Sequence, residues 1–261
     1  MFDLRGKTAL VTGGARTLGL DAACVLAAAG CHVAITSRSE ESARESAARL
    51  SAEYGVDSLG LGLDQVRHAA VVNAFRRVLD WKPAVDILIN NAGGGSGTSP
   101  ALLFERDVED IDELLRVNLN GVLYCCREVG RHMAERGSGK IVNIASIAGM
   151  CGRDRRMYTQ GGLKGQPVDY AAAKAGVIGL TMDLAGYLSP RGVCVNAISP
   201  GGFERGQPEE FIRLYSERTP LGRMGRDGID LKGAILFLSS PASDYVTGQN
   251  LAVDGGFTIW H

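Results

Sequence analysis

Short apolar runs alternate with helical stretches along the whole chain, and this alternation limits the possible folds more than any other feature of the sequence. Two of the runs, VDILIN at 85–90 and KIVNIA at 140–145, are continuous rather than alternating with polar residues. Continuous runs are typical of strands that are covered on both faces. Strands alternating with helices in this way predict an α/β fold, with one doubly wound, Rossmann-type parallel sheet and helices on both faces.

The pattern predicts strands at 8–12, 32–36, 58–63, 86–90, 140–145, 193–198 and 251–253, and helices at 18–29, 40–53, 66–81, 108–136, 170–188 and 228–239. Gly30 and Gly137 stand where helix C-caps are expected. Two segments, near 147–168 and near 201–226, are long for connections in such a fold. The second contains the helical pattern EEFIRLYSER. We expect the first to be a loop insertion and the second a substrate lid, both at the ligand-binding edge of the sheet.

Composition excludes several classes of function. The 28 basic residues nearly cancel the 29 acidic ones, so neither nucleic acid nor a membrane surface is an expected partner. The six cysteines form no C-x-x-C pair and the four histidines share no ligand spacing, so no metal site is expected. The N-terminus meets a strand at once and no apolar run is long enough to span a membrane, which favours a cytoplasmic protein.

The segment VTGGARTLG at 11–19 joins the first predicted strand to the first predicted helix. A phosphate-binding turn at this place needs a tight reversal, free backbone N–H groups and close helix packing. Gly13, Gly14 and Gly19 can serve the turn and the packing, although their spacing is not that of G-x-G-x-x-G. By itself the segment is equally typical of an ordinary strand-to-helix connection.

Five more short motifs follow this turn along the chain, and together the six are far more specific than any one. With them the chain resembles the classical short-chain dehydrogenase/reductase family over essentially its whole length. The resemblance implies a single dinucleotide-binding catalytic domain over 1–261 and hydride transfer between NAD(P) and a secondary alcohol or ketone. The matching residues are Thr12, Gly13, Gly19, Asn90, Asn91, Ala92, Gly93, Asn118, Ser146, Tyr170, Lys174, Asn196, Pro200 and Gly201.

The resemblance also implies a role for each catalytic residue. Tyr170 exchanges the proton of the alcohol, and Lys174 holds the hydroxyls of the nicotinamide ribose. Ser146 donates a hydrogen bond to the substrate oxygen, and Asn118 positions a water that links Lys174 to solvent. Asp64 matches the residue that contacts the adenine amino group. The cofactor-binding residues implied in this way are Gly13, Arg16, Thr17, Leu18, Gly19, Ser37, Arg38, Asp64, Asn91, Ala92, Gly93, Tyr170, Lys174, Pro200 and Gly201.

The spacing of Tyr170 and Lys174 places both side chains on one face of a helix. A tyrosine becomes a useful base when its pKa falls from about 10 toward about 7, a change worth about 4 kcal/mol. A unit charge at about 4 Å in an effective dielectric of about 20 supplies that energy. We therefore expect the lysine charge to lower the pKa of Tyr170.

Two departures from the family pattern need an explanation. Thr17 replaces the middle glycine of the first turn, where its side chain either narrows the pocket or donates to a phosphate oxygen; we expect cofactor binding to survive. Ser146 and Tyr170 are 24 positions apart, more than in most relatives. Tyr158 lies closer, but Gly162 stands where its lysine should be, and the glycines around Tyr158 argue against a helix. We therefore predict Tyr170 as the catalytic tyrosine.

The end of the second strand indicates which nicotinamide cofactor is used. A carboxylate there binds the ribose 2′-hydroxyl of NAD, whereas a basic side chain accommodates the 2′-phosphate of NADP. Here the strand ends at Ser37, Arg38 follows, and the first carboxylate is Glu40. Arg16 adds a second positive charge on the same side. These residues favour NADP over NAD, unless both arginines are simply solvated.

The segment at 147–168 contains four basic residues, Arg153, Arg155, Arg156 and Lys164, against Asp154 alone. If part of it faces the cleft, an anionic substrate such as a sugar acid fits; otherwise it is a solvated or subunit-contact loop.

The tail YVTGQNLAVDGGFTIW resembles sugar and polyol dehydrogenases and also 3-oxoacyl thioester reductases of the family. A sugar, polyol or sugar acid is therefore the expected small-molecule substrate, and a 3-oxoacyl thioester is the alternative. A non-catalytic nucleotide-binding regulator on the same fold is a third possibility. The resemblance further implies a homotetramer built from the helices at 108–136 and 170–188 and the C-terminal strand, although these apolar faces could equally be buried within one chain.

Overall fold

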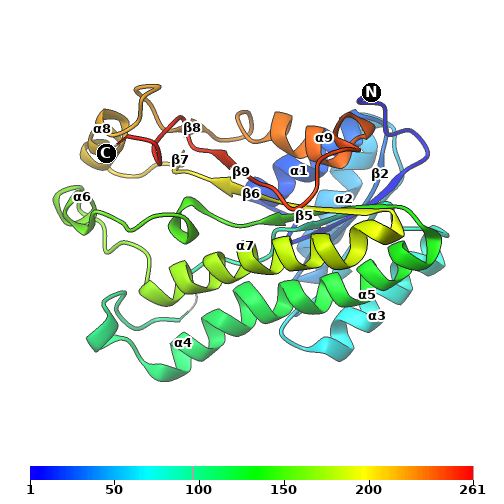
Figure 1. Cartoon of the computed structure of the whole chain (residues 1–261), viewed down its shortest axis with the longest axis horizontal. Coiled ribbons are helices and arrows are strands. Elements are labelled where there is room, and N and C mark those ends of the chain that lie inside the picture. The colour runs from blue at the N-terminus through cyan, green and yellow to red at the C-terminus, as the bar shows by residue number, and fades with distance from the viewer. Residues whose placement is uncertain (96, 261) are drawn as a thin grey trace.

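One parallel sheet forms the centre of the molecule, with helices on both sides (Figure 1). The computed structural model describes residues 1–95 and 97–260, and in that part of the chain the sheet has seven strands in the order β3-β2-β1-β4-β5-β6-β9. The doubly wound parallel fold expected from the sequence is thus confirmed, and each predicted strand end lies within two residues of the observed one. The strands are β1 (Thr8–Thr12), β2 (His32–Ser37), β3 (Ser58–Gly62), β4 (Ile87–Asn90), β5 (Gly139–Ile144), β6 (Val193–Pro200) and β9 (Asn250–Val253).

The apolar side chains of the sheet pack into two layers, which explains why the strand sequences are continuously apolar. Every residue of β1 and β4 is buried. One face is covered by α3 (His68–Trp81), α5 (Gly121–Arg136) and α7 (Val168–Leu188), and the other by α1 (Thr17–Ala28), α2 (Glu40–Tyr54) and α9 (Lys232–Ser239). A strand between two such layers has no face for water.

Local signals predicted most helix ends. Gly137 caps α5 in the left-handed conformation with φ of 73°, and Gly30 follows α1 with φ of 88°. The helix predicted at 108–136 is not regular, however. It consists of α4 (Val108–Leu115), a π-helical turn (Arg116–Asn120) and then α5. The helix predicted from residue 228 also begins later, at Lys232.

The two long segments both contain short elements. The first contains a 3-10 turn (Ile147–Gly149) and α6 (Arg155–Gln160), and the second contains β7 (Phe203–Glu204), α8 (Glu209–Glu217) and β8 (Gly225–Arg226). Tyr158 therefore lies in a helix, and the expectation that nearby glycines exclude one is wrong. Asp154 caps the start of α6 by accepting from the N–H of Arg156 at 3.0 Å, and the glycines only end it. Further 3-10 turns lie at Leu103–Glu105, Ser189–Arg191 and Pro241–Ser243.

The strand order reverses between β1 and β4. In an open parallel sheet, a crevice forms at this switch point beyond the carboxyl ends of the strands, and ligands bind there. Both long segments reach this edge of the sheet, on the left of Figure 1. None of the helices formed by residues 1–95 and 97–260 has the length and apolar character needed to cross a membrane.

Candidate active site

A cavity of about 1050 Å³ occupies the crevice at the switch point. Its wall extends from the turn after β1 to α6 and α8, so it can hold an extended molecule with a second, smaller one beside it. All the predicted cofactor-binding residues except Gly19 line this wall, namely Gly13, Arg16, Thr17, Leu18, Ser37, Arg38, Asp64, Asn91, Ala92, Gly93, Tyr170, Lys174, Pro200 and Gly201.

The glycines after β1 leave room that side chains would fill. Gly13 has φ of 64°, and a Cβ there would lie 2.9 Å from the Cα of Ala92. A Cβ on Gly19 would lie 2.2 Å from the carbonyl oxygen of Gly13, so Gly19 allows α1 to pack against the turn from below the cavity. This cradle at a helix N-terminus fits the pyrophosphate of a dinucleotide.

Thr17 is the one non-glycine residue in the described chain with a positive φ, at 48°. Its side chain is exposed. The left-handed region is unfavourable for a β-branched residue, whereas glycine adopts it readily. The structure thus gives a backbone reason for the family's glycine, in addition to the side-chain effect considered from the sequence.

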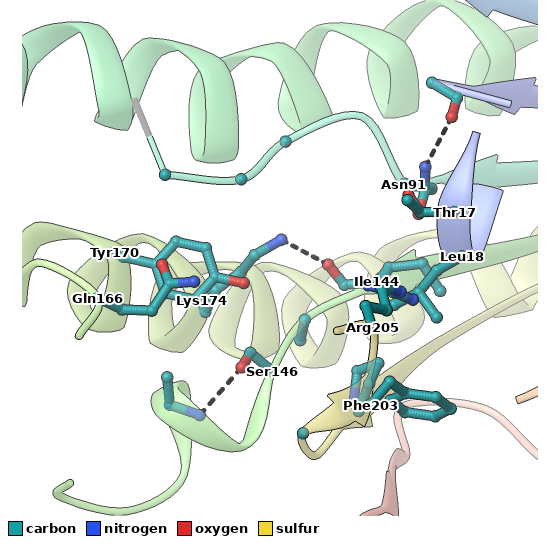
Figure 2. Close-up of a pocket in the computed structure, with 18 of the residues that line it drawn as sticks. Thr17, Leu18, Asn91, Ile144, Ser146, Gln166, Tyr170, Lys174, Phe203 and Arg205 are labelled. Atoms are coloured by element: carbon teal, nitrogen blue, oxygen red, sulfur yellow. Dashed lines mark hydrogen bonds between the residues drawn. The ribbon is translucent and has the colours of Figure 1, made fainter. Parts of the chain in front are cut away.

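Two polar residues hold the turn after β1 against the segment after β4. The hydroxyl of Thr12 accepts from the backbone N–H groups of Asn91 and Ala92, both at 3.0 Å. The amide of Asn91 donates to the carbonyl oxygens of Thr12 and Gly13, both at 3.1 Å (Figure 2). Asn91 therefore shapes the wall of the cavity, and Thr12 acts as its partner. We did not assign Thr12 to the site from sequence, although it begins the first motif.

Two arginines lie at the end of the cavity next to β2. Arg16 and Arg38 are exposed in its wall, and no ion pair joins either of them to an acid among the residues described. Glu40, the first carboxylate after β2, is already paired with Arg44 at 2.7 Å and Arg77 at 3.1 Å. This end of the cavity therefore has positive charge, and two arginines already engage Glu40.

Tyr170 and Lys174 extend from the first turns of α7 toward the end of β5. The ammonium of Lys174 is buried, donates to the carbonyl oxygen of Ile144 at 2.7 Å, and lies 5.7 Å from the centroid of the Tyr170 ring. Figure 2 shows both side chains on the same side of the cavity as Ser146. The tertiary structure thus brings together three of the four predicted catalytic residues.

Ser146 is the N-cap of the 3-10 turn that follows β5. Its hydroxyl oxygen accepts from the N–H of Ala148 at 3.1 Å, which leaves the hydroxyl hydrogen to be donated. Tyr170 is within hydrogen-bonding reach of this hydroxyl. Ser146 is thereby oriented to donate into the cavity.

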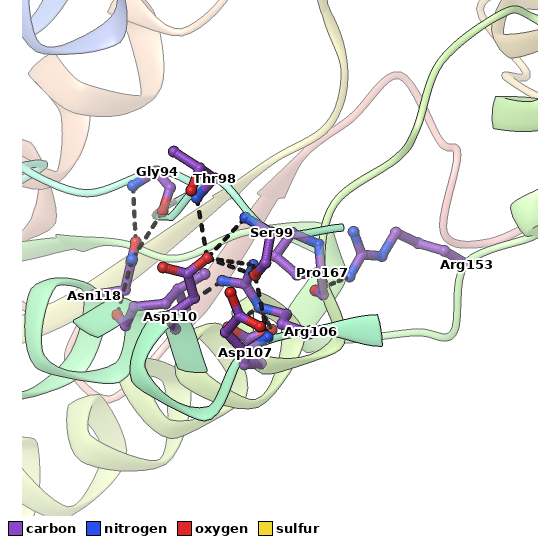
Figure 3. Close-up of polar contacts among 11 residues, drawn as sticks. Gly94, Thr98, Ser99, Arg106, Asp107, Asp110, Asn118, Arg153 and Pro167 are labelled. Atoms are coloured by element: carbon purple, nitrogen blue, oxygen red, sulfur yellow. Dashed lines mark hydrogen bonds and ion pairs between the residues drawn. The ribbon is translucent and has the colours of Figure 1, made fainter. Parts of the chain in front are cut away.

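Asn118 is fully buried in the π-helical turn, behind the wall of the cavity rather than in it. Its amide donates to the carbonyl oxygens of Gly94 at 2.8 Å and Leu114 at 3.1 Å, and its side-chain oxygen accepts from the N–H of Gly94 at 2.8 Å (Figure 3). Asn118 therefore supports the segment after β4, and its role in positioning a water stays a prediction. π-Helical turns often occur at functional sites.

Comparison with known proteins decides the family. A family model described as enoyl-(acyl carrier protein) reductase matches residues 13–258. The chain belongs to the short-chain dehydrogenase/reductase family. This short-chain dehydrogenase/reductase is an NAD(P)-dependent oxidoreductase that transfers a hydride between nicotinamide and a secondary alcohol or ketone, as expected from its motifs.

Its relatives act on different substrates. The 3-oxoacyl-[acyl-carrier-protein] reductase of Aquifex aeolicus is 37% identical over 257 residues, covering 97% of this chain and 98% of that protein. The gluconate 5-dehydrogenase of Gluconobacter oxydans is 36% identical over 265 residues, covering 99% of this chain and 97% of that protein. The crystal structure of a gluconate 5-dehydrogenase from Burkholderia cenocepacia, in complex with NADP and tartrate, has a TM-score of 0.88 and 37% identity, covering 100% and 98% of the two chains.

Burial has a larger effect on the catalytic pKa values of this short-chain dehydrogenase/reductase than the lysine charge. Burial raises the pKa of Tyr170, while the hydrogen bond from Ser146 and the charge of Arg153 oppose this change. Burial also lowers the pKa of Lys174 to about 8. The sequence argument, in which the lysine charge lowers the pKa of Tyr170, is therefore wrong for the protein alone, because it left out the desolvation of both groups.

The far end of the cavity is formed by the segment at 147–168 and α8. Aromatic rings line it, and Tyr215 stacks on Phe257 with 4.5 Å between centroids. Tyr158, which we rejected as the catalytic residue, lies against Phe211 at 5.2 Å between centroids. Several polar residues of the wall were absent from the sequence-based assignment because no motif marks them, among them Gln65, Gln166 and Arg205.

Proposed function

We propose that this enzyme uses NADP(H) to interconvert a secondary alcohol and a ketone in a sugar, polyol or sugar acid. The observation that carries the proposal is the convergence of Tyr170, Lys174 and Ser146 on one cavity wall, between a glycine cradle and a second, polar and aromatic compartment. Such a compartment suits a small hydroxylated molecule that lies against the end of a bound dinucleotide.

The chain contributes proton transfer and orientation. The hydroxyl oxygen of Ser146 accepts from Ala148, and its hydrogen can be donated either to Tyr170 or to the substrate oxygen. Tyr170 takes the alcohol proton during oxidation and returns it during reduction. Burial lowers the pKa of Lys174 to about 8, so its ammonium gives up a proton more readily than that of an exposed lysine. When bound, the nicotinamide accepts or supplies the hydride, and its positive charge in the oxidised form favours the phenolate.

The preference for NADP over NAD rests on Arg16 and Arg38. An arginine binds a phosphate through charge-assisted hydrogen bonds, and neither side chain is engaged by an acid within the described residues. Glu40 could bind the ribose 2′-hydroxyl of NAD only by giving up its ion pairs with Arg44 and Arg77.

A cofactor-coupled screen tests the proposal. Both oxidised cofactors are offered with sugars, polyols and sugar acids, and NADPH is offered with acetoacetyl thioester. Tyr170→Phe is expected to keep cofactor binding and to abolish turnover, whereas the matched Tyr158→Phe variant retains turnover. Near-normal activity of Tyr170→Phe would refute the assignment of the catalytic tyrosine.

Reduction of a 3-oxoacyl thioester is the second candidate. It is favoured by the 37% identity to the Aquifex aeolicus reductase and by the aromatic residues that line the far compartment. Turnover of acetoacetyl thioester with NADPH, without turnover of any sugar, polyol or sugar acid, would select this function instead.

We also propose a homotetramer as the working assembly. Large apolar side chains lie exposed on the elements that the family resemblance implicates, including Leu123 on α5, Met182 and Tyr187 on α7, and Leu251 on β9. Light scattering of the purified protein measures the assembly directly, and a monomeric mass would contradict the proposal.

A further inference from the structure

Arg153 is held next to the catalytic helix. It lies in the insertion, between the 3-10 turn after Ser146 and α6, and lines the cavity. Its Nη2 atom donates to the carbonyl oxygen of Pro167 at 2.9 Å (Figure 3). Pro167 is the N-cap of α7, three residues before Tyr170. The guanidinium therefore has a defined position relative to the catalytic tyrosine.

The second terminal nitrogen of this guanidinium is buried without a partner. Nη1 of Arg153 forms no hydrogen bond within residues 1–95 and 97–260. The neighbouring acid, Asp154, is engaged elsewhere, since it pairs with Arg156 at 2.8 Å and Arg218 at 3.6 Å. Burial accordingly lowers the pKa of Arg153, and the neighbouring Tyr158 hydroxyl partly opposes this change. A buried charged donor without a partner is unfavourable, so such a group in a cavity points to an anionic ligand.

The other cations of the insertion and lid do not share these properties. Arg205 also lines the cavity, but it pairs with Asp227 at 2.7 Å. Lys164 is exposed, and Arg156 faces solvent with its charge paired. Among the described cations that line the far compartment, Arg153 is the one with a buried terminal nitrogen that forms no direct hydrogen bond. Its charge also opposes the rise that burial causes in the pKa of Tyr170 and Tyr158.

We propose that Nη1 of Arg153 binds the carboxylate of an anionic substrate, so that this enzyme prefers a sugar acid to a neutral sugar or polyol. The inference rests on the proposed function and specifies its substrate class. A guanidinium recognises a carboxylate through charge-assisted hydrogen bonds. With the carboxylate on Arg153, a secondary hydroxyl of the same molecule can reach Ser146 and Tyr170, which lie on the same wall.

The test compares two substrates that differ in the carboxylate, gluconate and glucitol, with the whole enzyme and its oxidised cofactor. Selectivity is measured as the ratio of kcat/KM for gluconate to kcat/KM for glucitol. In Arg153→Gln this ratio is expected to fall about 10- to 100-fold, the effect of losing one charge-assisted hydrogen bond. Arg153→Lys keeps the charge and is expected to retain part of the preference. Arg155→Gln, an exposed arginine of the same insertion, is the control and is expected to keep the wild-type ratio.

The outcomes separate this inference from the function on which it rests. A wild-type enzyme that oxidises either compound, with a ratio that Arg153→Gln and Arg153→Lys leave unchanged, overturns the inference alone. A wild type that prefers glucitol to gluconate also overturns the inference alone. If Arg153→Gln does not fold, as judged by thermal unfolding and cofactor binding, Arg153→Lys decides by the same ratio. A wild type that turns over no sugar, polyol or sugar acid refutes the proposed function, and the inference with it.

Discussion

Replacing Thr17 by glycine is expected to stabilise the enzyme, although glycine usually destabilises a helix. Thr17 has φ of 48° at the start of α1, and a non-glycine residue in this region is strained by about 1–2 kcal/mol. Glycine removes the strain but adds about 0.5–1 kcal/mol of conformational entropy to the unfolded chain. The exposed side chain of Thr17 forms no hydrogen bond within the described residues, so no hydrogen bond is lost. The net gain is about 0.5–1 kcal/mol.

Thermal unfolding of the cofactor-free protein measures this gain. For 261 residues the entropy of unfolding is about 0.55 kcal/mol/K, so the Tm rises by about 1–2 °C. Thr17→Val is the matched control, because it stays β-branched at the same φ and is not expected to raise the Tm. A Tm lowered by Thr17→Gly, as for glycine in an ordinary exposed helix, would show that the backbone at this position is not strained.

The same variant tests whether the native turn is impaired in cofactor binding. The Thr17 side chain is exposed at the cavity wall, and the cradle is formed by Gly13 and Gly19. The Kd for the cofactor, measured by titration, is therefore expected to change by less than about tenfold, or about 1.4 kcal/mol. Tightening by orders of magnitude would mean that Thr17 compromises the native site.

Three further predictions concern buried charge and cofactor choice. Asp169→Ala removes the buried carboxylate that pairs with Arg106 at 2.8 Å, and urea unfolding should show a loss of about 3–5 kcal/mol; a loss below 1 kcal/mol would contradict this reasoning. Because burial lowers the pKa of Lys174 to about 8, its cation destabilises the fold below pH 8 and this penalty fades toward the unfolded pKa of 10.5. The stability advantage of Lys174→Met over wild type should thus shrink between pH 8 and 10, and a constant difference would refute the burial effect. Arg38→Glu should lower the NADP-to-NAD ratio of kcat/KM at least about tenfold, and an unchanged ratio would refute its role in phosphate binding.

The sequence was sufficient to predict a structural element wherever its conformation depended on neighbouring residues along the chain. The strands were found because continuous apolar runs have one common use in an α/β fold, and Gly137 marked a helix end because its left-handed conformation favours glycine. The π-helical turn around Asn118 was not found, since its side-chain bonds to Gly94 and Leu114 depend on how the segment after β4 packs. The helix containing Tyr158 was missed because its burial depends on contacts with α8, although Asp154 is a local signal for its start.

The sequence by itself determined the succession of strands and helices along the chain, the glycine turn and the positions of the motif residues. Each of these depends on local conformation or on spacing within one element. Only the tertiary structure decided the direction of the pKa shifts of Tyr170 and Lys174 and the burial of the Arg153 guanidinium. Both are consequences of desolvation, which depends on the atoms that surround a group in space. The sequence places Asp154 next to Arg153, but the fold pairs that acid with Arg156 and Arg218 instead.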